Sequence, residues 1–435
     1  MQKILLFGDG NFLRAFAGEY IENANEKSGN IKAYICQPRT NTKVIDALKE
    51  QNCKYDVIFR GRLGGKVIDE RKTVTSFEGA IDTVGEYNKL TELFCDNDLQ
   101  IVISNTTEAG ICFNEKDRIE NSPAVSFPAK MTALLYERYK SGVGDIVFLP
   151  VELIENNGSA LKGCILKYVD LWGLEAEFKE YVKGKCYFCN TLVDRIVTGH
   201  TEGDEDKCSV TCEPYRSWII EADSYAKDTI PFDGIDYTDS IEIFRKRKVR
   251  ILNGIHTMSV PAAYMAGFDI VRDVVNDKLF NDFIKCGTAE IEKTLPFSCS
   301  DFTDSVIERF NNPFIDHKLL DIALNSVSKF RERCLYTLLD YIEIEKTIPA
   351  ALAFSFAALI AFYNKENERE YELRDSEDII DFFENKPDVH AVLSNTAFWG
   401  RNLTEVDGLE SAVEKYYALI KSKGVKAAIE EVIYE

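Results

Sequence analysis

The sequence lacks the signatures of several common enzyme classes. It has no G-x-S-x-G nucleophile elbow, no G-x-x-x-x-G-K-[ST] phosphate loop and no H-E-x-x-H zinc motif. Histidine is also scarce, with four residues in 435. These gaps argue against serine hydrolases, P-loop nucleotide hydrolases and zinc proteases.

Positive charge is in short supply as well. Lysine and arginine total 52 against 72 aspartates and glutamates, which leaves a formal net charge of −20. A nucleic-acid-binding protein needs a basic surface to meet phosphates. The composition therefore argues against a nucleic-acid partner.

Long apolar runs are few. The most apolar stretch, residues 347–363, is near the lower limit for a membrane span and has Pro349 near its start. We expect it to form a buried core helix. The apolar run before Gly8 is too short for a secretory signal, so we expect a cytoplasmic protein with no membrane partner.

Cysteine, by contrast, is abundant, with twelve residues. Cys186 and Cys189 form one close pair, and Cys208 and Cys212 form a second pair that 18 residues separate from the first. Two such pairs resemble the ligand spacing of a structural zinc site. The alternative is four unrelated thiols, which we favour, and we assign no metal.

The order of apolar segments predicts an α/β Rossmann-like domain followed by an all-helical domain. Strand-like runs alternate with helical periodicity in the first part of the chain, which indicates a doubly wound parallel sheet. After residue 250 helical periodicity dominates, and residues 228–239 have the composition of a linker. We expect a nucleotide-binding domain over 1–244 and a helical substrate domain over 245–435. The expected strands are 3–7, 32–36, 55–61, 66–77, 99–105 and 145–154, and the expected helices between them are 12–26, 42–51, 82–94 and 128–140.

A glycine-bearing turn follows the first strand. Gly8 allows a tight turn, and Gly10 lets the backbone approach a pyrophosphate held by the next helix. Leu13 stands where the usual motif has its third glycine. The second strand ends in Gln37 and Arg39 instead of the acid that holds the ribose of NAD, so these residues leave NAD or NADP open.

The segment KVRILNGIHT brings Lys248, Asn253 and His256 together. In a regular α-helix, Asn253 and His256 would lie about 140° and about 80° from Lys248, on one broad face. A base and a donor so placed suit alcohol oxidation by hydride transfer, provided that the lysine pKa is lowered to about 7 to 8. The cations of residues 245–250 favour such a shift and could attract a substrate carboxylate. The alternative is a solvated helix end with a core histidine and a capping asparagine.

With these motifs, the chain resembles the mannitol dehydrogenase family, and within it the branch of tagaturonate reductases. The matching stretches are FGDGNFLRAF, SNTTEAGI, PAVSFPAKMTALLYERY, LPVELIENNG, FCNTLVDRIVTG, RKVRILNGIHT, NPFIDHKLLDIALNSVSKFRER and LAFSFAALIAFY. The resemblance implies a metal-independent reductase that uses NAD, with NADP less expected. Its partner would be a small sugar acid, with D-tagaturonate and D-altronate interconverted by a monomer or small homo-oligomer.

The resemblance also implies a role for each matching residue. Lys248 would be the general acid and base, Asn253 would stabilise the oxyanion, and His256 would orient the substrate oxygens. The nucleotide would contact Gly8, Gly10, Asn11, Phe12, Arg14 and Gln37, with Thr106, Thr107 and Glu108 beside the nicotinamide. Arg309, His317 and Lys329 would bind substrate.

Two departures from the family pattern keep alternatives open. Mannitol-type members carry an asparagine after an acid where this chain has Glu152 and Leu153, and Asn190 is our candidate to replace the missing donor. They also carry an acid just before the lysine, where this chain has Arg245 and Lys246. The second departure suits an anionic substrate. Three alternatives remain. The chain could be a fructuronate reductase or a mannitol-type polyol dehydrogenase, or it could be a catalytically silent protein that binds a nucleotide or a sugar acid.

Overall fold

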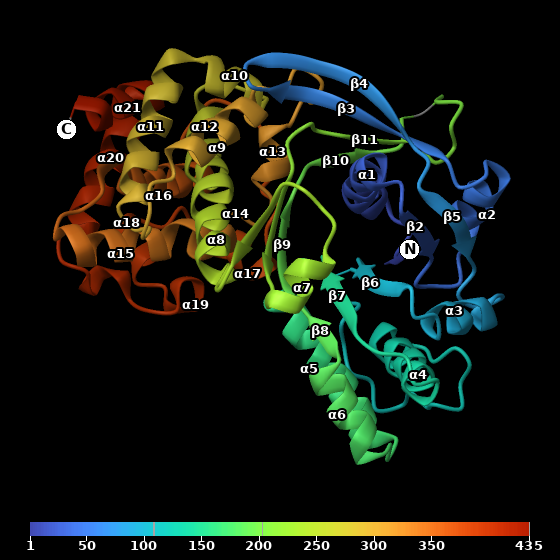
Figure 1. Cartoon of the computed structure of the whole chain (residues 1–435). Helices are drawn as coiled ribbons and strands as arrows, with labels where there is room; N and C mark the ends of the chain where they lie inside the picture. The colour runs from blue at the N-terminus through green and yellow to red at the C-terminus, as the bar shows by residue number, and fades with distance from the viewer. Residues whose placement is uncertain (108, 202, 435) are drawn as a thin grey trace. The chain divides into compact units, whose positions relative to one another are not determined.

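A six-stranded parallel sheet forms the centre of the first part of the chain (Figure 1). The computed structural model describes residues 1–107, 109–201 and 203–434. The sheet order is β5-β2-β1-β6-β7-β8. Successive strands are added on one side of β1 as far as β5 and on its other side from β6 onward. This is the doubly wound arrangement predicted from the sequence. The strands are β1 (Gln2–Phe7), β2 (Ile31–Cys36), β5 (Phe77–Ile81), β6 (Leu99–Ser104), β7 (Ile146–Pro150) and β8 (Cys186–Phe188).

Helices cover both faces of this sheet because its strands are apolar on both faces. In β1, Ile4 and Leu6 enter one core, and Leu5 and Phe7 enter the other. The first core receives side chains of α1 (Asn11–Ser28) and α2 (Lys43–Glu50). The second receives those of α3 (Tyr87–Phe94), α4 (Phe127–Lys140), α5 (Asn157–Leu171) and α6 (Ala176–Gly184).

Two smaller sheets were not predicted. One has the order β10-β11-β3-β4, and the other has the order β13-β12-β9. Their strands are β3 (Tyr55–Leu63), β4 (Lys66–Val74), β9 (Asn190–Asp194), β10 (Val197–Gly199), β11 (Val210–Cys212), β12 (Ser217–Glu221) and β13 (Ile235–Thr238). The strand-like runs at 55–61 and 66–77 therefore form, up to Val74, a hairpin outside the main sheet, visible in Figure 1 as the long pair β3 and β4, while Phe77 begins β5 of the main sheet.

Two local predictions were wrong. The expected linker 228–239 contains the end of α7 (Ser224–Thr229) and all of β13, which pairs in parallel with β12. The expected helix 82–94 begins only at Tyr87, because Asp82 and Glu86 instead close a turn. The Asp82 carboxylate accepts the Val84 N–H (3.0 Å), and the Glu86 carboxylate accepts the Asp82 N–H (3.0 Å).

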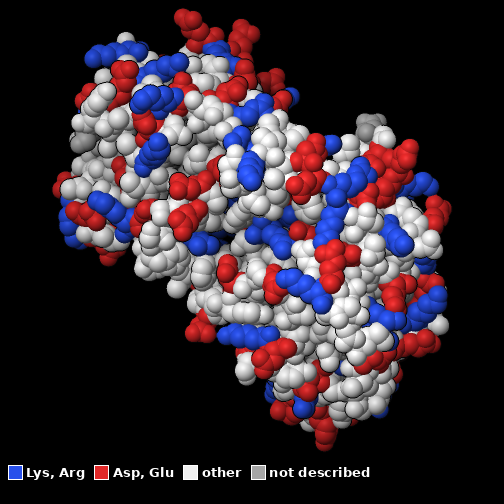
Figure 2. All heavy atoms as spheres, turned by 45° about the horizontal axis from the view of Figure 1, so that its top comes forward, with Lys and Arg blue, Asp and Glu red and all other residues white. Residues whose placement is uncertain are grey.

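The chain divides by contacts into two units. The sheet unit contains Met1–Gly61 and Ile68–Ile241, and the helical unit contains Arg62–Val67 and Glu242–Glu435. The tip of the β3–β4 hairpin belongs to the helical unit, where the N–H groups of Gly64 and Gly65 donate to the Glu308 carboxylate (3.1 and 2.5 Å). Acidic and basic side chains are interspersed on the face shown in Figure 2.

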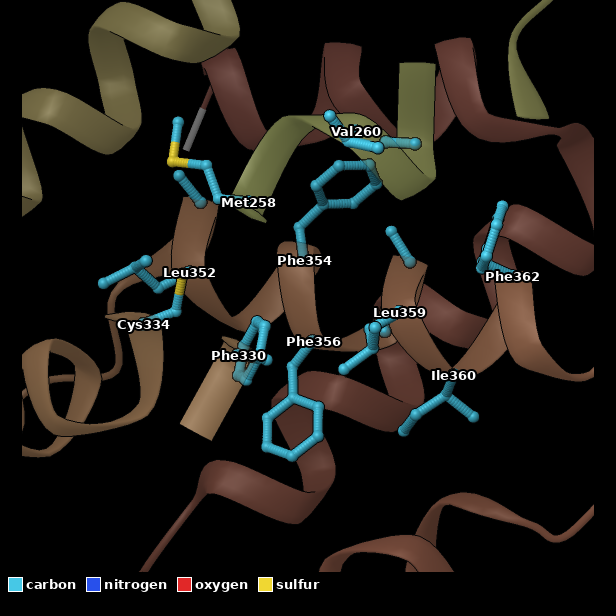
Figure 3. Close-up of a cluster of buried hydrophobic side chains, with 14 of the residues drawn as sticks. Met258, Val260, Phe330, Cys334, Leu352, Phe354, Phe356, Leu359, Ile360 and Phe362 are labelled. Atoms are coloured by element: carbon cyan, nitrogen blue, oxygen red, sulfur yellow. The ribbon is translucent and has the colours of Figure 1, made fainter. Parts of the chain in front are cut away.

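The helical unit is built around one apolar helix, α16 (Ala350–Tyr363). Residues 351–363 are all buried, because helices α9, α11, α20 and α21 pack around it. Side chains of α9, α14 and η2 meet those of α16 in Figure 3. The prediction of a buried core helix is confirmed. In the described part of the chain, no helix combines the length and apolarity needed to cross a membrane.

The other helices of this unit range from single turns to helices as long as α16. The helical periodicity predicted after residue 250 is interrupted at Asn325, which has a left-handed φ of 55°. The elements are α8 (Ile241–Lys248), η1 (Val249–Asn253), α9 (Gly254–Met265), α10 (Val271–Asn276), α11 (Lys278–Glu292), α12 (Ser300–Phe310), α13 (Leu319–Ile322), α14 (Ser326–Phe330), η2 (Arg331–Leu335), α15 (Tyr336–Glu345), α17 (Glu377–Glu384), α18 (Val389–Leu393), α19 (Thr396–Trp399), η3 (Leu403–Glu405), α20 (Leu409–Lys423) and α21 (Val425–Tyr434).

Candidate active site

The loop between β1 and α1 has the geometry of a nucleotide-binding turn. Gly8 has a φ of +143°, and a Cβ there would lie 2.8 Å from the Asn105 carbonyl oxygen, so the turn requires glycine. A Cβ at Gly10 would meet nothing within 4 Å, and no side chain caps the α1 N-terminus. The loop therefore leaves room, and first-turn N–H groups, for a phosphate.

Arg14 holds this loop from within the protein. Its side chain is buried and donates to the Asp9 carbonyl and to Asn11 Oδ1 (3.0 Å). Phe12 is partly exposed and stacks on Phe16, with ring centroids 5.1 Å apart. Of the predicted loop residues, Arg14 is thus placed to support the loop, while Asn11 lies exposed at its surface.

The end of β6 is joined to the end of β7 by a buried glutamate. Glu152 accepts hydrogen bonds from Ser104 Oγ (3.1 Å), the Thr106 N–H (2.9 Å) and Thr106 Oγ1 (3.0 Å). Burial raises the pKa of the Glu152 carboxyl. Thr107 follows with a φ of 89°, an unusual value for a non-glycine residue. Glu108 lies outside the described residues, and Leu153 is largely exposed.

Gln37 does not face outward at the end of β2. It is 1% exposed, and its Nε2 donates to Asp82 Oδ1 (2.5 Å). Asp82 follows β5, the strand paired with β2. The carboxylate that is missing after β2 is therefore supplied by the residue that follows the neighbouring strand. Only the sheet pairing reveals it, because the two positions are 45 residues apart in the chain.

Asn190 is engaged within the sheet unit. Its Oδ1 accepts the Ser159 N–H (2.9 Å), and its Nδ2 donates to Glu221 Oε2 (2.7 Å). These contacts tie β9 to α5 and β12. They give the Asn190 amide a structural use, which differs from the free donor that we expected.

Lys248, Asn253 and His256 lie on a continuous helical segment with one wide turn. The angles worked out for a regular α-helix do not apply here, because η1 is a π-helical turn between α8 and α9. Backbone hydrogen bonds in such a turn join residues five apart. Lys248 and Asn253 are five apart, so the wide turn brings them closer to one face than a regular helix would.

His256 is the best-defined group of this set. Its ring stacks on Phe310 (centroids 4.0 Å apart, 15° between planes) and meets His317 edge-on (5.4 Å, 83°). Among the described residues its buried Nε2 has no hydrogen-bond partner. Burial, followed by the charges of His317, Arg333, Arg309 and Lys329, holds the pKa of His256 well below its ordinary value. The imidazole is therefore neutral and can donate or accept one hydrogen bond to a ligand.

The structure thus brings four predicted residues together: His256, Arg309, His317 and Lys329. Burial lowers the pKa of the His317 imidazole, and burial followed by the Arg333 charge lowers that of the Lys329 ammonium. Arg333, which our sequence analysis missed, joins them from η2 and donates to Thr257 Oγ1 (3.4 Å). We call Arg309, Lys329 and Arg333 the cationic cluster.

The basic run at residues 245–250 has its own partners. Arg245 pairs with Glu242 (2.6 Å), Lys246 pairs with Asp340 (3.3 Å), and Arg250 pairs with the same aspartate. Arg247 lies over the Phe302 ring, 4.4 Å from its centroid. These contacts offset much of the positive charge that we expected to act on Lys248 and on a substrate.

The four cysteines considered for zinc do not converge. Cys186 lies in the core on one face of the main sheet, and the other three lie in the core on the opposite face. The described residues contain no group of three or more potential ligands that could hold a metal. Burial raises the thiol pKa to about 12 in Cys189 and Cys212 and to about 11 in Cys208, so these are buried structural thiols.

A doubly wound sheet with a glycine turn after its first strand, followed by a helical unit with a lysine, an amide and a neutral imidazole, defines a two-part dehydrogenase. The chain matches the model of the mannitol dehydrogenase Rossmann domain over residues 2–234 and that of the mannitol dehydrogenase C-terminal domain over residues 240–421. It belongs to the mannitol dehydrogenase family.

The chain resembles its relatives over nearly its full length. It is 37% identical to the altronate oxidoreductase of Bacillus subtilis (strain 168), over 99% of this chain and 95% of that one. It is 33% identical to the altronate oxidoreductase of Phocaeicola vulgatus, over 99% and 97%.

Two solved structures share the fold. A D-sorbitol dehydrogenase in substrate-free form has a TM-score of 0.84 at 21% identity, covering 98% of this chain and 94% of that one. The Pseudomonas fluorescens mannitol 2-dehydrogenase, in a ternary complex with NAD and D-mannitol, has a TM-score of 0.68 at 19% identity, covering 100% and 94%.

Proposed function

We propose that the chain is a tagaturonate reductase that interconverts D-tagaturonate and D-altronate. The observation that carries this proposal is the set of charges around His256, where cations of three helical elements gather beside a neutral imidazole. Such a site suits a polyhydroxy substrate with a carboxylate better than an uncharged polyol. The full-length similarity to altronate oxidoreductases supports the same substrate.

In the direction of reduction, Lys248 would give its proton to the ketone oxygen as the carbonyl carbon gains hydride. A nicotinamide cofactor, when bound, supplies that hydride. The Asn253 amide would donate to the same oxygen as negative charge develops on it. His256, held neutral, would hold a neighbouring hydroxyl through its unpaired Nε2. In oxidation the lysine would act in reverse, as the base.

For the cofactor we propose NAD. The loop of Gly8, Gly10 and Asn11 and the α1 N-terminus would hold the pyrophosphate, with Thr106 and Thr107 closer to the nicotinamide. Asp82 favours NAD over NADP, because a carboxylate beside the end of β2 can accept from ribose hydroxyls and repels a 2′-phosphate. We also infer a cytoplasmic location, which the described free thiols support.

The test is oxidation of NADH at 340 nm with D-tagaturonate, D-fructuronate and D-fructose in parallel, and with NADPH in place of NADH. We expect fast turnover of tagaturonate with NADH. Faster turnover of fructuronate or fructose would reassign the substrate. Bound cofactor without turnover of any of the three would favour a silent binding protein.

A second experiment uses a variant to test the proton transfer. Lys248→Ala should lower kcat by at least about 100-fold, since a positioned acid or base contributes about 10²–10⁴-fold. The Kd for NADH, measured by fluorescence titration, should stay as in the wild type. Turnover within tenfold of the wild type would show that another group moves the proton. The matched control is Lys246→Ala, because the Lys246 ammonium of the wild type is paired with Asp340.

A further inference from the structure

Two cations of the cluster lie on one helical segment, with Asp375 near Lys329 but not in an ion pair with it. Lys329 is on α14 and Arg333 is four residues later on η2, and the Arg333 charge lowers the pKa of Lys329. Lys329 donates to the Ile322 carbonyl (2.8 Å), and Arg333 donates to Thr257 Oγ1 (3.4 Å). Neither pairs with a carboxylate in the part of the chain that the structure describes. Like charges four apart on a helix destabilise the fold.

Other arginines of the helical unit do have acidic partners. Arg250 pairs with Asp340, Arg272 with Asp316, Arg369 with Asp269 and Arg374 with Asp321. The chain as a whole has 20 more acidic than basic residues. Acids are therefore plentiful, and two adjacent cations without one mark a place where a ligand supplies the negative charge.

Arg333 is also fixed against the helix that carries His256. Its partner Thr257 is the residue after His256, and a Cβ at Gly254 would lie 3.6 Å from the Arg333 carbonyl oxygen. The next residue, Cys334, donates from Sγ to the Gly254 carbonyl (3.8 Å). The two π-helical turns η1 and η2 thus pack against each other, and such turns are frequent at functional sites.

We propose that Arg333 binds the substrate carboxylate, with Lys329 beside it, and so selects sugar acids over neutral keto-sugars. This inference rests on the proposed function. In D-tagaturonate the carboxylate is at the opposite end of the carbon chain from the ketone that is reduced. A cation other than Lys248 must therefore hold it. A guanidinium offers two parallel N–H donors that match a carboxylate, whereas an ammonium is a single point charge.

The experiment compares Arg333→Gln, Arg333→Lys and the control Arg331→Gln. Arg331 lies on the same turn, but its side chain faces Gly400, where a Cβ would lie 3.0 Å from Nη2. The assays are kcat and KM for D-tagaturonate, Kd for D-altronate by calorimetry, Kd for NADH by fluorescence, and Tm.

We expect Arg333→Gln to lower kcat/KM about 100-fold, mostly through KM, with a matching rise in the Kd for D-altronate. The kcat/KM of Arg333→Lys should lie between those of Arg333→Gln and the wild type, because lysine keeps the positive charge but lacks the two parallel N–H donors of the guanidinium. Arg331→Gln should behave as the wild type, and the Kd for NADH should not change in any variant.

An unchanged KM in Arg333→Gln, or an equal loss in Arg331→Gln, overturns the inference. A wild type that reduces neutral keto-sugars and not D-tagaturonate overturns the proposed function itself. The two failures are therefore distinguishable, because the first is measured against a wild type that turns tagaturonate over.

Discussion

Removal of the buried titratable carboxyl of Glu290 should change how stability depends on pH. Glu290 projects from α11 and caps the first turn of α16, where its two oxygens accept the N–H groups of Ala351 (2.8 Å) and Leu352 (3.0 Å). Pro349, at the start of that helix, offers no side-chain cap. Burial raises the pKa of the Glu290 carboxyl to about 7, against the lowering effect of these N–H groups and of Lys293.

The sign and size follow from proton linkage. A carboxyl with a pKa of about 7 when folded and 4.5 when unfolded holds its proton more tightly in the folded chain. The stability that this contributes is complete below pH 4.5 and is lost as the pH rises through 7. The loss is about 3 kcal/mol in total and about 2 kcal/mol between about pH 5.5 and pH 8.5.

Glu290→Gln removes this titration and keeps an oxygen for one of the two N–H groups. Urea unfolding, followed by circular dichroism, should therefore show the variant gaining about 2 kcal/mol on the wild type between about pH 5.5 and pH 8.5. Glu292→Gln, on the same helix, is the matched control for loss of one charge. If wild type and Glu290→Gln change in parallel over this range, the carboxyl is not held neutral and the reasoning fails.

Two further predictions concern the nucleotide loop and the cofactor. Asp82→Asn should lower the ratio of the Kd for NADPH to the Kd for NADH by at least about tenfold in fluorescence titrations, because it removes a charge that repels a 2′-phosphate. Glu78→Gln on β5 is the control. An unchanged ratio in Asp82→Asn would show that Asp82 does not select between the two cofactors. Gly8→Ala should lower stability by about 1–3 kcal/mol, because its φ is +143° and its Cβ would lie 2.8 Å from the Asn105 carbonyl oxygen. Gly10→Ala, which meets nothing within 4 Å, should leave the Tm unchanged and weaken only NADH binding; a fall in Tm equal to that of Gly8→Ala would show that the room at Gly10 is not kept for the nucleotide.

The main sheet and the central helix could be predicted because their signals are local. The continuous apolar strand at residues 3–7 and the glycine turn after it identify a buried parallel strand and a βα loop without any tertiary information. The stretch 347–363 is apolar on every side and too short for a typical membrane span, a pattern that indicates a helix buried in a protein core. The short strand β13 (Ile235–Thr238) was not predicted because Pro231 and Gly234 place turn signals directly before it, and its strand character depends on pairing with β12.

The parts of the site that were missed depend on contacts distant in sequence. Asp82 gains its place beside β2 only through the pairing of β2 with β5. In the sequence, Arg333 is one of several charges in a helical segment, and only the packing of η2 against α9 shows that it lies near His256. No local pattern distinguishes Arg333 from Arg331, which is two residues away and faces Gly400.

The irregular features of the helical unit coincide at one place, and its core explains how they persist. Two π-helical turns and a pair of unpaired cations are each unfavourable in isolation. The same turns bury Ile251 and Cys334, and the adjoining helices bury Ile255 and Phe330, all in the core formed by α16. Apolar packing thus stabilises a backbone that carries Asn253 on one turn, directly after Lys248 at the end of α8, and Arg333 on the other turn. These unfavourable turns and the repulsion between the two cations lie beside His256, where the binding of an anionic substrate would offset them.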